Sequence, residues 1–483
     1  MIENKGPVLG ARHVQAILLF LVIVIQYASR TSIAVSLVAM TDAKTTNINF
    51  HEFDWNEKEK SYILSSFFWG YILFQIPGGY AARRIGVKKT VFFSTLLSSI
   101  LGLLVPFCAF WGGWKLFSFI RFLMGLSQAV LFPCVYQHVA NWSPVEERNR
   151  LGAISNSGVE LGTIVGMFVT GMIAASGMGW PGISYIYNGI GIVFGIFWLI
   201  FAENTPAEAR FITSLERNYI LDSQANIGGW QGKEIPIPWK AMLTSSPLIS
   251  YLVVGMCDTW GFDTMMSQIP SYLHGTMKMD ISKNAFYSAL PYVSMWVCSY
   301  VSMIGADILM KNEWISLLTL RRIFATIAMS VPAGFLIGVG FINENQRGLA
   351  ITFVTLNVGF SGASTIGCFL NLIDLTPNHT GIVYALQNTL ASLVSIVCPI
   401  VAGLIVHDET DRSQWRILFI IAAIIYVLGN LQFLYLAQAE KQPWDHEDFM
   451  KKFETEPGVQ ISRPSSKKEE FSLNDEFMVI GKR

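Results

Sequence analysis

The sequence predicts an all-α membrane protein with twelve transmembrane helices in two halves of six and with both termini in the cytoplasm. Hydrophobic residues fill 52% of the 483 positions and charged residues only 14%, which does not suit a water-exposed surface. Apolar runs of about 20 residues, each long enough to cross roughly 30 Å of hydrocarbon, recur along most of the chain. Lys and Arg residues gather in alternate connections between these runs, which indicates a fixed orientation.

The twelve predicted spans fall into two groups of six, as expected for two halves related by an axis along the membrane normal. The spans are residues 14–40, 60–82, 90–110, 115–141, 151–176, 184–203, 247–273, 284–309, 321–341, 348–373, 380–406 and 415–438. We therefore divide the chain into an N-terminal half (1–203), a cytoplasmic central loop (204–246), a C-terminal half (247–439) and a disordered cytoplasmic tail (440–483).

The orientation follows from the cations. A helix that bends at Pro77-Gly78-Gly79 ends in a short loop with Arg83, Arg84, Lys88 and Lys89, which is typical of a membrane hairpin that turns in the cytoplasm. With the N-terminus inside, the inner connections and the N-terminal segment hold fifteen Lys and Arg residues, and the outer loops hold nine. This bias predicts that both termini lie in the cytoplasm.

Several function classes are excluded by composition and by motif. The formal net charge is zero, so no nucleic-acid partner is expected. We find no glycine-rich phosphate loop, no His-Glu metal helix and no Ser-His-Asp arrangement, so the chain is not expected to be an enzyme or to hold a metal or cofactor. The six cysteines all lie in apolar runs and are read as small buried hydrophobes.

Two arginines, Arg30 and Arg121, lie well inside predicted spans. A charge near the centre of a membrane helix costs about 2.5–3.5 kcal/mol on insertion scales, so each needs a reason to be there. One reason is pairing with carboxylates in helix contacts. The other is an anion site in a water-filled cavity, because a guanidinium donates two parallel hydrogen bonds to a carboxylate or phosphate. Gln128 is seven residues from Arg121 and shares its helix face.

Three carboxylates also lie inside spans: Glu160, Asp258 and Asp263. They are candidates for coupling to an ion, because a buried carboxylate can exchange a proton near neutrality or ligate Na⁺ together with carbonyl oxygens. A satisfied helix–helix contact is the alternative for each. Asp263 follows Asp258 by five positions, about 140° around a helix, so we expect the two to lie on different faces.

Six segments together resemble the anion:cation symporter family of the major facilitator superfamily, which holds the type I sodium–phosphate cotransporters, sialin and the vesicular glutamate transporters. The segments are SRTSIAVSLVAM (29–40), SFFWGYILFQIPGGYAARRIG (66–86), RFLMGLSQAVLFP (121–133), NWSPVEERNRLG (141–152), VGFSGASTIGCFLNLIDLTP (358–377) and EKQPW (440–444).

The resemblance implies a substrate site. Arg30 and Arg121 match the family arginines that are linked to anion substrates, Tyr71 matches an aromatic residue near the pocket, and Asn371 matches an Asn on the tenth helix. Gln128, a further substrate-site candidate, stands where proton-coupled relatives have a titratable Glu.

Two more departures separate the chain from the glutamate transporters, because Asp258 stands where they have an Arg in their second half and Leu64 stands where they have a His before the SFFWGY segment. Among the members of the family, we therefore expect the chain to be closest to the putative inorganic phosphate cotransporters.

The inner hairpin loop is similar to the superfamily's conformational gate. Gly79, Arg83, Arg84 and Gly86 belong to it, although Arg83 stands where an Asp is usual. The equivalent place between the eighth and ninth spans keeps Asp307.

The expected function is secondary active transport of small anions, either inorganic phosphate or organic carboxylates, coupled to Na⁺ or H⁺ by alternating access. An alternative is sialin-like, proton-coupled export of acidic sugars or amino acids. A remote alternative is a membrane sensor or receptor that does not transport. We expect a multi-pass monomer in the plasma membrane or in an endolysosomal or vesicular membrane, with a small anion and the lipid bilayer as its partners.

Overall fold

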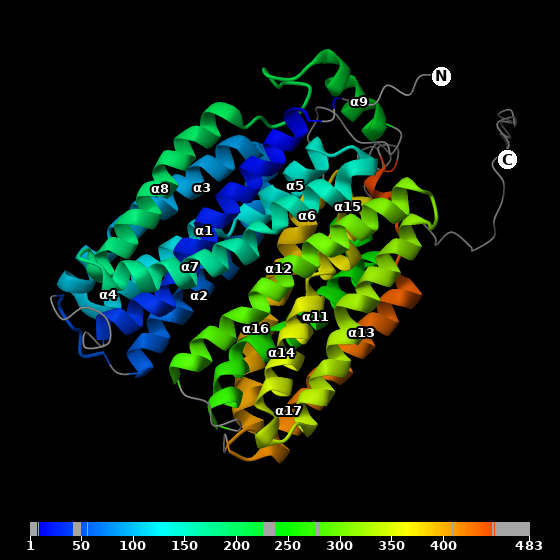
Figure 1. Cartoon of the computed structure of the whole chain (residues 1–483). Helices are drawn as coiled ribbons and strands as arrows, with labels where there is room; N and C mark the ends of the chain where they lie inside the picture. Colours follow the sequence, from blue (N-terminus) through cyan, green and yellow to red (C-terminus); the bar gives the residue numbers. More distant parts are fainter. Residues whose placement is uncertain are drawn as a thin grey trace, which may run out of the picture.

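The computed structural model describes residues 7, 9–41, 50–55, 57–225, 237–275, 281–407, 410–446 and 449. Within these ranges the chain folds into long, roughly parallel helices that form two bundles side by side (Figure 1). The helices carry exposed apolar side chains on their outer faces, such as Leu73, Val193 and Leu404, which is the pattern expected of a surface in contact with lipid.

The first bundle, called the N-half, contains the helices before the central loop. Its pairs α1·α7, α2·α4 and α3·α8 pack along one another. The helices are α1 (Ala11–Thr41), α2 (Glu57–Arg84), α3 (Val87–Leu103), α4 (Val105–Gln128), α5 (Leu131–Trp142), α6 (Arg148–Asn156), α7 (Gly158–Ala175) and α8 (Gly179–Phe201).

The second bundle, called the C-half, contains the helices after the central loop, with α13·α17, α11·α17 and α12·α14 as its main packed pairs. The helices are α11 (Ser246–Gly275), α12 (Ile281–Lys311), α13 (Leu317–Phe341), α14 (Arg347–Ser361), α15 (Asn371–Leu375), α16 (Thr380–Ile405) and α17 (Arg412–Leu436). Along the chain, the two halves are separated by the short helices α9 (Ser214–Ala225) and α10 (Trp239–Leu243). Residues 226–236 of the predicted central loop lie outside the described ranges.

Several predicted spans are built from more than one helix. The predicted fourth span ends as α5, and the predicted fifth is divided into α6 and α7 at Ser157. The tenth contains α14, a π-helical turn at Thr365–Phe369 and α15. At Gly113, where φ is 57°, the chain turns between the third and fourth predicted spans, a conformation that glycine adopts without strain.

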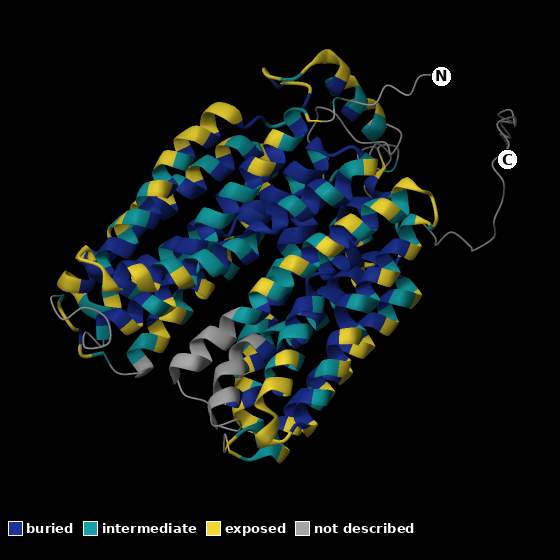
Figure 2. Ribbon diagram, viewed as in Figure 1, coloured by how far each residue is buried: buried dark blue, intermediate teal, exposed yellow. Residues whose placement is uncertain are grey.

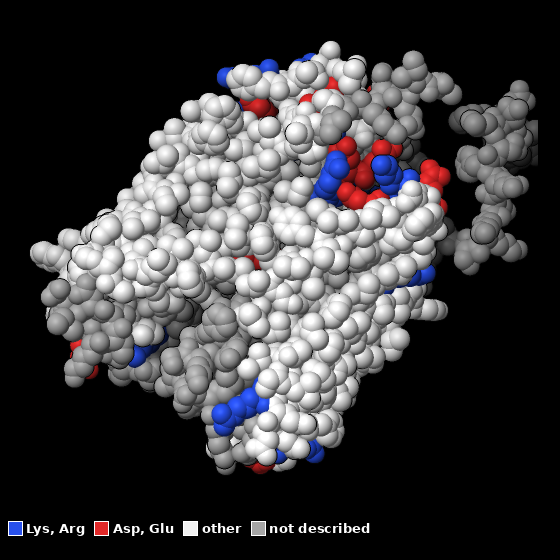
Figure 3. Space-filling view, in the orientation of Figure 1, with Lys and Arg blue, Asp and Glu red and all other residues white. Residues whose placement is uncertain are grey.

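In the described part of the chain, nine helical stretches are long and apolar enough to cross a membrane. Together with α2, α3 and α11, which run alongside them, they are consistent with the predicted twelve crossings (Figure 1). Buried residues fill the interior of both bundles and exposed residues follow their outer faces (Figure 2). On the face drawn in Figure 3, charged side chains gather mainly toward the two ends and leave the middle largely uncharged.

Helix α1 begins and α17 ends at the same end of the molecule, which we call the gate end (Figure 1). The two halves meet along α2 and α5 against α16, and along α6 and α7 against α12. The prediction of a disordered tail from residue 440 is wrong for the start of the tail, because Trp444 and Asp445 are buried against the C-half. Residues 450–483 of that tail lie outside the described ranges.

Candidate functional site

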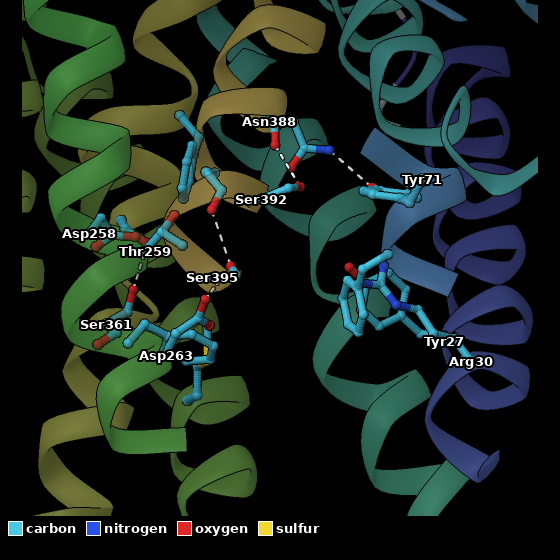
Figure 4. Close-up of a pocket in the computed structure, with 16 residues that line it drawn as sticks. Tyr27, Arg30, Tyr71, Asp258, Thr259, Asp263, Ser361, Asn388, Ser392 and Ser395 are labelled. Atoms are coloured by element: carbon cyan, nitrogen blue, oxygen red, sulfur yellow. Dashed lines mark hydrogen bonds between the residues drawn. The ribbon is translucent and has the colours of Figure 1, made fainter. Parts of the chain in front are cut away.

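A cavity of about 240 Å³ lies between the two halves (Figure 4). The N-half contributes one cation and three aromatic rings to its wall, and the C-half contributes two carboxylates and a row of hydroxyl and amide groups. The lining residues are Tyr27, Arg30, Phe68, Tyr71, Asp258, Thr259, Phe262, Asp263, Met295, Ser361, Ser364, Phe369, Asn388, Ala391, Ser392 and Ser395.

Arg30 reaches the cavity from α1 through a cage of aromatic rings. Its guanidinium carbon lies 5.3 Å from the ring centre of Tyr27, 4.7 Å from Phe67, 5.0 Å from Phe68 and 5.0 Å from Tyr71. Each such contact contributes ~0.5–2 kcal/mol, so four rings can offset the ~2.5–3.5 kcal/mol cost of a charge at membrane depth. In the ranges that the structure describes, no carboxylate forms an ion pair with this guanidinium, so the charge remains available to a ligand.

Arg121 is close to this site but does not line the cavity. Its guanidinium carbon lies 4.8 Å from the ring centre of Phe67, the same ring that Arg30 contacts, and the residue is 3% exposed. Its Nε has no hydrogen-bond partner. The structure therefore brings the two predicted arginines to one aromatic ring, but it exposes only Arg30 to the cavity.

Tyr71 joins the two halves across the cavity. Its hydroxyl accepts a hydrogen bond of 3.0 Å from Nδ2 of Asn388 on α16 (Figure 4). The family resemblance predicted a role for Tyr71, but Asn388 is one polar residue among several in its span and no motif marks it. Only the fold shows that it faces Tyr71.

Gln128 and Asn371, two of the predicted substrate contacts, do not line the cavity. Gln128 is buried inside the N-half, where its Nε2 donates to Ser98 Oγ at 2.7 Å. Asn371 lies at the start of α15 and donates through Nδ2 to the carbonyl oxygen of Gln438 at 2.8 Å. Both amides are used by packing within their own half, so we leave them out of the site.

Asp258 and Asp263 both line the cavity. Their spacing puts them about 140° apart around α11, so two different faces of this helix border the cavity. Asp263 accepts a hydrogen bond from Ser395 Oγ on α16. Asp258 is 6% exposed and its Oδ1 has no hydrogen-bond partner.

Glu160, the third predicted carboxylate, lies at the contact between the halves and not in the cavity. It is 6% exposed on α7, and Ser299 Oγ of α12 donates to its Oε1 at 3.4 Å. The other oxygen, Oε2, has no hydrogen-bond partner. A change in the charge of Glu160 would thus act directly on the packing of one half against the other.

The predicted gate residues lie at the gate end, and two of them contact the opposite half. A Cβ at Gly79 would lie 3.1 Å from the carbonyl oxygen of Gly381, so α2 and α16 approach closely there. Asp307 of α12 lies 4.0 Å from Nε of Arg150 on α6.

The other predicted gate residues belong to the end of the first hairpin. Arg83 and Arg84 form the last turn of α2. At Gly86, with φ of 90°, a Cβ would lie 2.7 Å from Asn204 Oδ1, so the residue packs against the segment that follows α8.

A buried charge network that the sequence did not predict crosses the gate end. Asp374 Oδ1 accepts from Arg148 Nη1 of the N-half at 3.1 Å, and Oδ2 accepts from Arg321 Nε at 2.8 Å. Nη1 of Arg321 donates to Asn149 Oδ1 of the N-half at 2.8 Å. The three charged side chains are at most 4% exposed. The signal in the sequence is Asp374 in the apolar stretch NLIDL, together with Arg148 before the fifth predicted span and Arg321 at the start of the ninth.

Comparison with known proteins identifies the family of this fold. A model of the Major Facilitator Superfamily matches residues 19–397. The chain belongs to the major facilitator superfamily. Human sialin is 33% identical over 460 residues, which cover 91% of this chain and 92% of sialin. A putative inorganic phosphate cotransporter of Drosophila melanogaster is 31% identical over 464 residues, which cover 91% of this chain and 87% of that protein.

The fold is also shared with a solved structure. The fucose:proton symporter of E. coli matches with a TM-score of 0.63 at 13% identity, over 89% of this chain and 100% of the other. The resemblance to the group that holds sialin and the phosphate cotransporters is confirmed. This member of the major facilitator superfamily is therefore a multi-pass membrane transporter and not an enzyme.

Proposed function

We propose that the protein is a secondary active transporter of small oxyanions, either inorganic phosphate or organic carboxylates, coupled to Na⁺ or H⁺ by alternating access. The observation that carries this proposal is the position of Arg30. Its guanidinium lines a cavity between the halves and, in the described ranges, has no carboxylate partner. A guanidinium offers paired donors to a carboxylate or phosphate, so an oxyanion is the ligand that suits it.

Arg121 takes the second part in substrate binding in this proposal. It lies against the face of Phe67, next to Arg30, and its Nε has no hydrogen-bond partner. A change in the Phe67 side chain when the halves move would bring both guanidinium groups to the same anion. Tyr71 links the cavity wall of the N-half to α16 of the C-half through its hydrogen bond to Asn388, so a ligand that displaces this bond changes the contact between the halves.

Coupling to Na⁺ or H⁺ is assigned to the three carboxylates. Asp258 and Asp263 face the cavity opposite Arg30, so a bound cation or proton there changes the field at the anion (Figure 4). Glu160 lies between α7 and α12, where its charge affects the contact between the halves. Burial of a carboxylate is costly, and binding of a cation relieves part of that cost; Oδ1 of Asp258 and Oε2 of Glu160 are buried oxygens that have no hydrogen-bond partner in the described part of the chain.

Alternating access requires the gate end to open and close. The close approach of Gly79 to α16 supports a gate that is closed in this structure. So do the contacts across the halves, which are the ion pairs of Arg148 and Arg150 and the hydrogen bond from Arg321 to Asn149. We assign the gate end to the cytoplasm because the inner connections carry the excess of Lys and Arg. Both termini and the central loop then lie in the cytoplasm, in a protein that acts as a monomer and binds no nucleic acid.

A second candidate is the export of acidic sugars or amino acids with protons, as the similarity to sialin suggests. The observation that favours it is the C-half wall of the cavity, where Ser361, Ser364, Ser392 and Ser395 offer hydroxyl groups to a larger organic anion. Transport of phosphate is favoured by the similarity to the putative inorganic phosphate cotransporter of Drosophila melanogaster. The proposed membrane is the plasma membrane for the first candidate and an endolysosomal or vesicular membrane for the second.

The test is uptake by the purified protein in liposomes. Labelled phosphate, glutamate and sialic acid are offered in turn, each with a Na⁺ gradient alone and with an H⁺ gradient alone. We expect accumulation of at least one oxyanion with one of the two gradients. If the folded protein neither takes up nor exchanges any of the three anions, the proposal is wrong for these substrates. That result would favour a membrane sensor or receptor that does not transport.

A further inference from the structure

The segment that follows α17 is bound to the gate end through the buried carboxylate of Asp445. We call residues 438–445 the C-terminal strap. Asp445, which is 0% exposed, accepts from His379 Nδ1 at 2.6 Å and from Thr376 Oγ1 at 2.9 Å. It also accepts from the backbone N–H of Asn378 at 3.3 Å. All three donors lie in the connection between α15 and α16, so one side chain holds that connection in place.

Backbone contacts of the strap extend this attachment along α15. The N–H of Gln442 donates to the carbonyl oxygen of Leu375 at 2.9 Å, and the carbonyl of Gln438 accepts from Asn371 at 2.8 Å. Trp444 is 4% exposed and its ring centre lies 6.1 Å from that of His379. The strap therefore contacts both ends of α15 and the segment after it.

Helix α15 needs such support because it is only five residues long. A helix of this length has almost no internal hydrogen bonds of its own and is not stable alone. It follows a π-helical turn at Thr365–Phe369, which adds a second irregular segment on its other side.

The same short helix carries Asp374, the carboxylate of the gate network. Asp374 lies between Arg148 of the N-half and Arg321 of the C-half. The segment 371–379 is thus held from two sides, by the strap on one and by the opposite half of the transporter on the other. A charge pair that crosses the halves depends on the placement of both partners, and the strap fixes one of them.

We propose that the C-terminal strap is a positioning element of the gate: through Asp445 it holds residues 371–379 so that Asp374 can pair with Arg148 when the gate is closed. Asp445→Asn removes the negative charge that His379 and Lys441 face and one of the two acceptor oxygens, which weakens the attachment of α15. The closed gate then loses part of its charge pairing, and the open gate gains population. The inference rests on the proposed alternating access but not on the identity of the substrate.

The experiment measures the gate directly in the full-length protein in liposomes. Spin labels are attached at Lys89→Cys of the N-half and Asn312→Cys of the C-half, both exposed at the gate end, after the six native cysteines are replaced by alanine. The distance distribution between the labels gives the ratio of open to closed gates. Asp445→Asn should raise this ratio about tenfold, because the free-energy cost of a buried polar group without a matched partner shifts the populations by about that factor. Glu440→Gln, an exposed position in the same strap, should leave it unchanged.

A double-mutant comparison separates positioning from a general loss of stability. In an Asp374→Asn background, Asp445→Asn should add less than a twofold change, because the carboxylate that it positions is already gone. Gly79→Val in that same background should still open the gate further, which shows that the readout is not saturated. Full additivity of Asp445→Asn with Asp374→Asn, or an unchanged ratio in the single variant, overturns the proposal. If Asp445→Asn does not fold, His379→Ala removes one donor of the same contact and should act in the same direction.

A failure of this inference can be told apart from a failure of the proposed function. The distances between the labels are measured without substrate, so they test the gate even if no anion is transported. A gate that never changes its distance distribution under any of these variants contradicts alternating access itself.

Discussion

Substitution of Arg148 by Met should open the gate end without removing the charge pair inside the C-half. Arg148 Nη1 donates to Asp374 Oδ1 at 3.1 Å, and it is the contact in the network that joins a cation of one half to a carboxylate of the other. Asp374 keeps its bond of 2.8 Å to Arg321 Nε in the variant. The change therefore removes one charge-assisted hydrogen bond between the halves and leaves no carboxylate without a cation.

The magnitude follows from the burial of the pair. Side chains that are 4% and 2% exposed make a charge-assisted hydrogen bond worth ~1.5–3 kcal/mol. Arg148 Nε is buried without a hydrogen-bond partner, so an apolar Met recovers part of that energy and we take the lower end of the range. About 1.5 kcal/mol corresponds to roughly a tenfold increase in the ratio of open to closed gates.

The assay is the distance between spin labels at positions 89 and 312, and the chain offers a matched control. Arg150 lies two residues away, is 37% exposed and reaches Asp307 only at 4.0 Å. A pair of this kind contributes ~0–1 kcal/mol, so Arg150→Met should change the ratio by about fivefold at most. Equal effects of the two variants, or an unchanged distance distribution in Arg148→Met, would refute the assignment of the gate to the buried network.

Three further predictions concern the site and its coupling. Gly79→Val should lower net uptake severalfold while the cavity still binds substrate, because its Cβ would already lie 3.1 Å from the Gly381 carbonyl; Gly171→Val, in open space, is the control, and equal uptake by the two variants argues against close packing at the gate. Arg121→Ala should nearly abolish uptake and Arg121→Lys should not restore it fully, since Lys is only a point charge; normal apparent affinity in Arg121→Ala would remove this residue from the site. Glu160→Gln and Asp258→Asn should each prevent ion-driven accumulation but retain counterflow of pre-loaded anion, whereas normal accumulation in both variants would assign these carboxylates to structural pairing.

The apolar periodicity of the sequence is sufficient to predict the membrane helices, because each helix needs about 20 apolar residues whatever its neighbours are. It could not predict that a predicted span divides at Ser157 or that a π-helical turn precedes α15, since both depend on packing between helices. Charge inside a span drew attention to Arg30, Asp258 and Asp263, and all three line the cavity.

What a polar side chain contacts could not be read from its position in a span. Gln128 and Asn371 stand at positions that match family motifs, yet each is used inside its own half. Asp374 was overlooked because an Asp near the end of a span looks like a residue of the membrane surface. Only the pairing of helices far apart in the sequence shows that it lies between two buried arginines.

The central claim is that the Arg30 guanidinium binds the transported anion, and a binding measurement tests it most directly. The anion that the liposome uptake assay identifies as a substrate is labelled, and its binding affinity is measured for the purified variants Arg30→Ala, Arg30→Lys and Arg416→Ala. Arg416 also lies over an aromatic ring, Phe341, but it is remote from the cavity lining. Removal of a buried charge-assisted contact costs about 2–5 kcal/mol, so Arg30→Ala should bind at least ~30-fold more weakly, Arg30→Lys should recover only part, and Arg416→Ala should bind normally. Unchanged affinity in a folded Arg30→Ala variant would contradict the account.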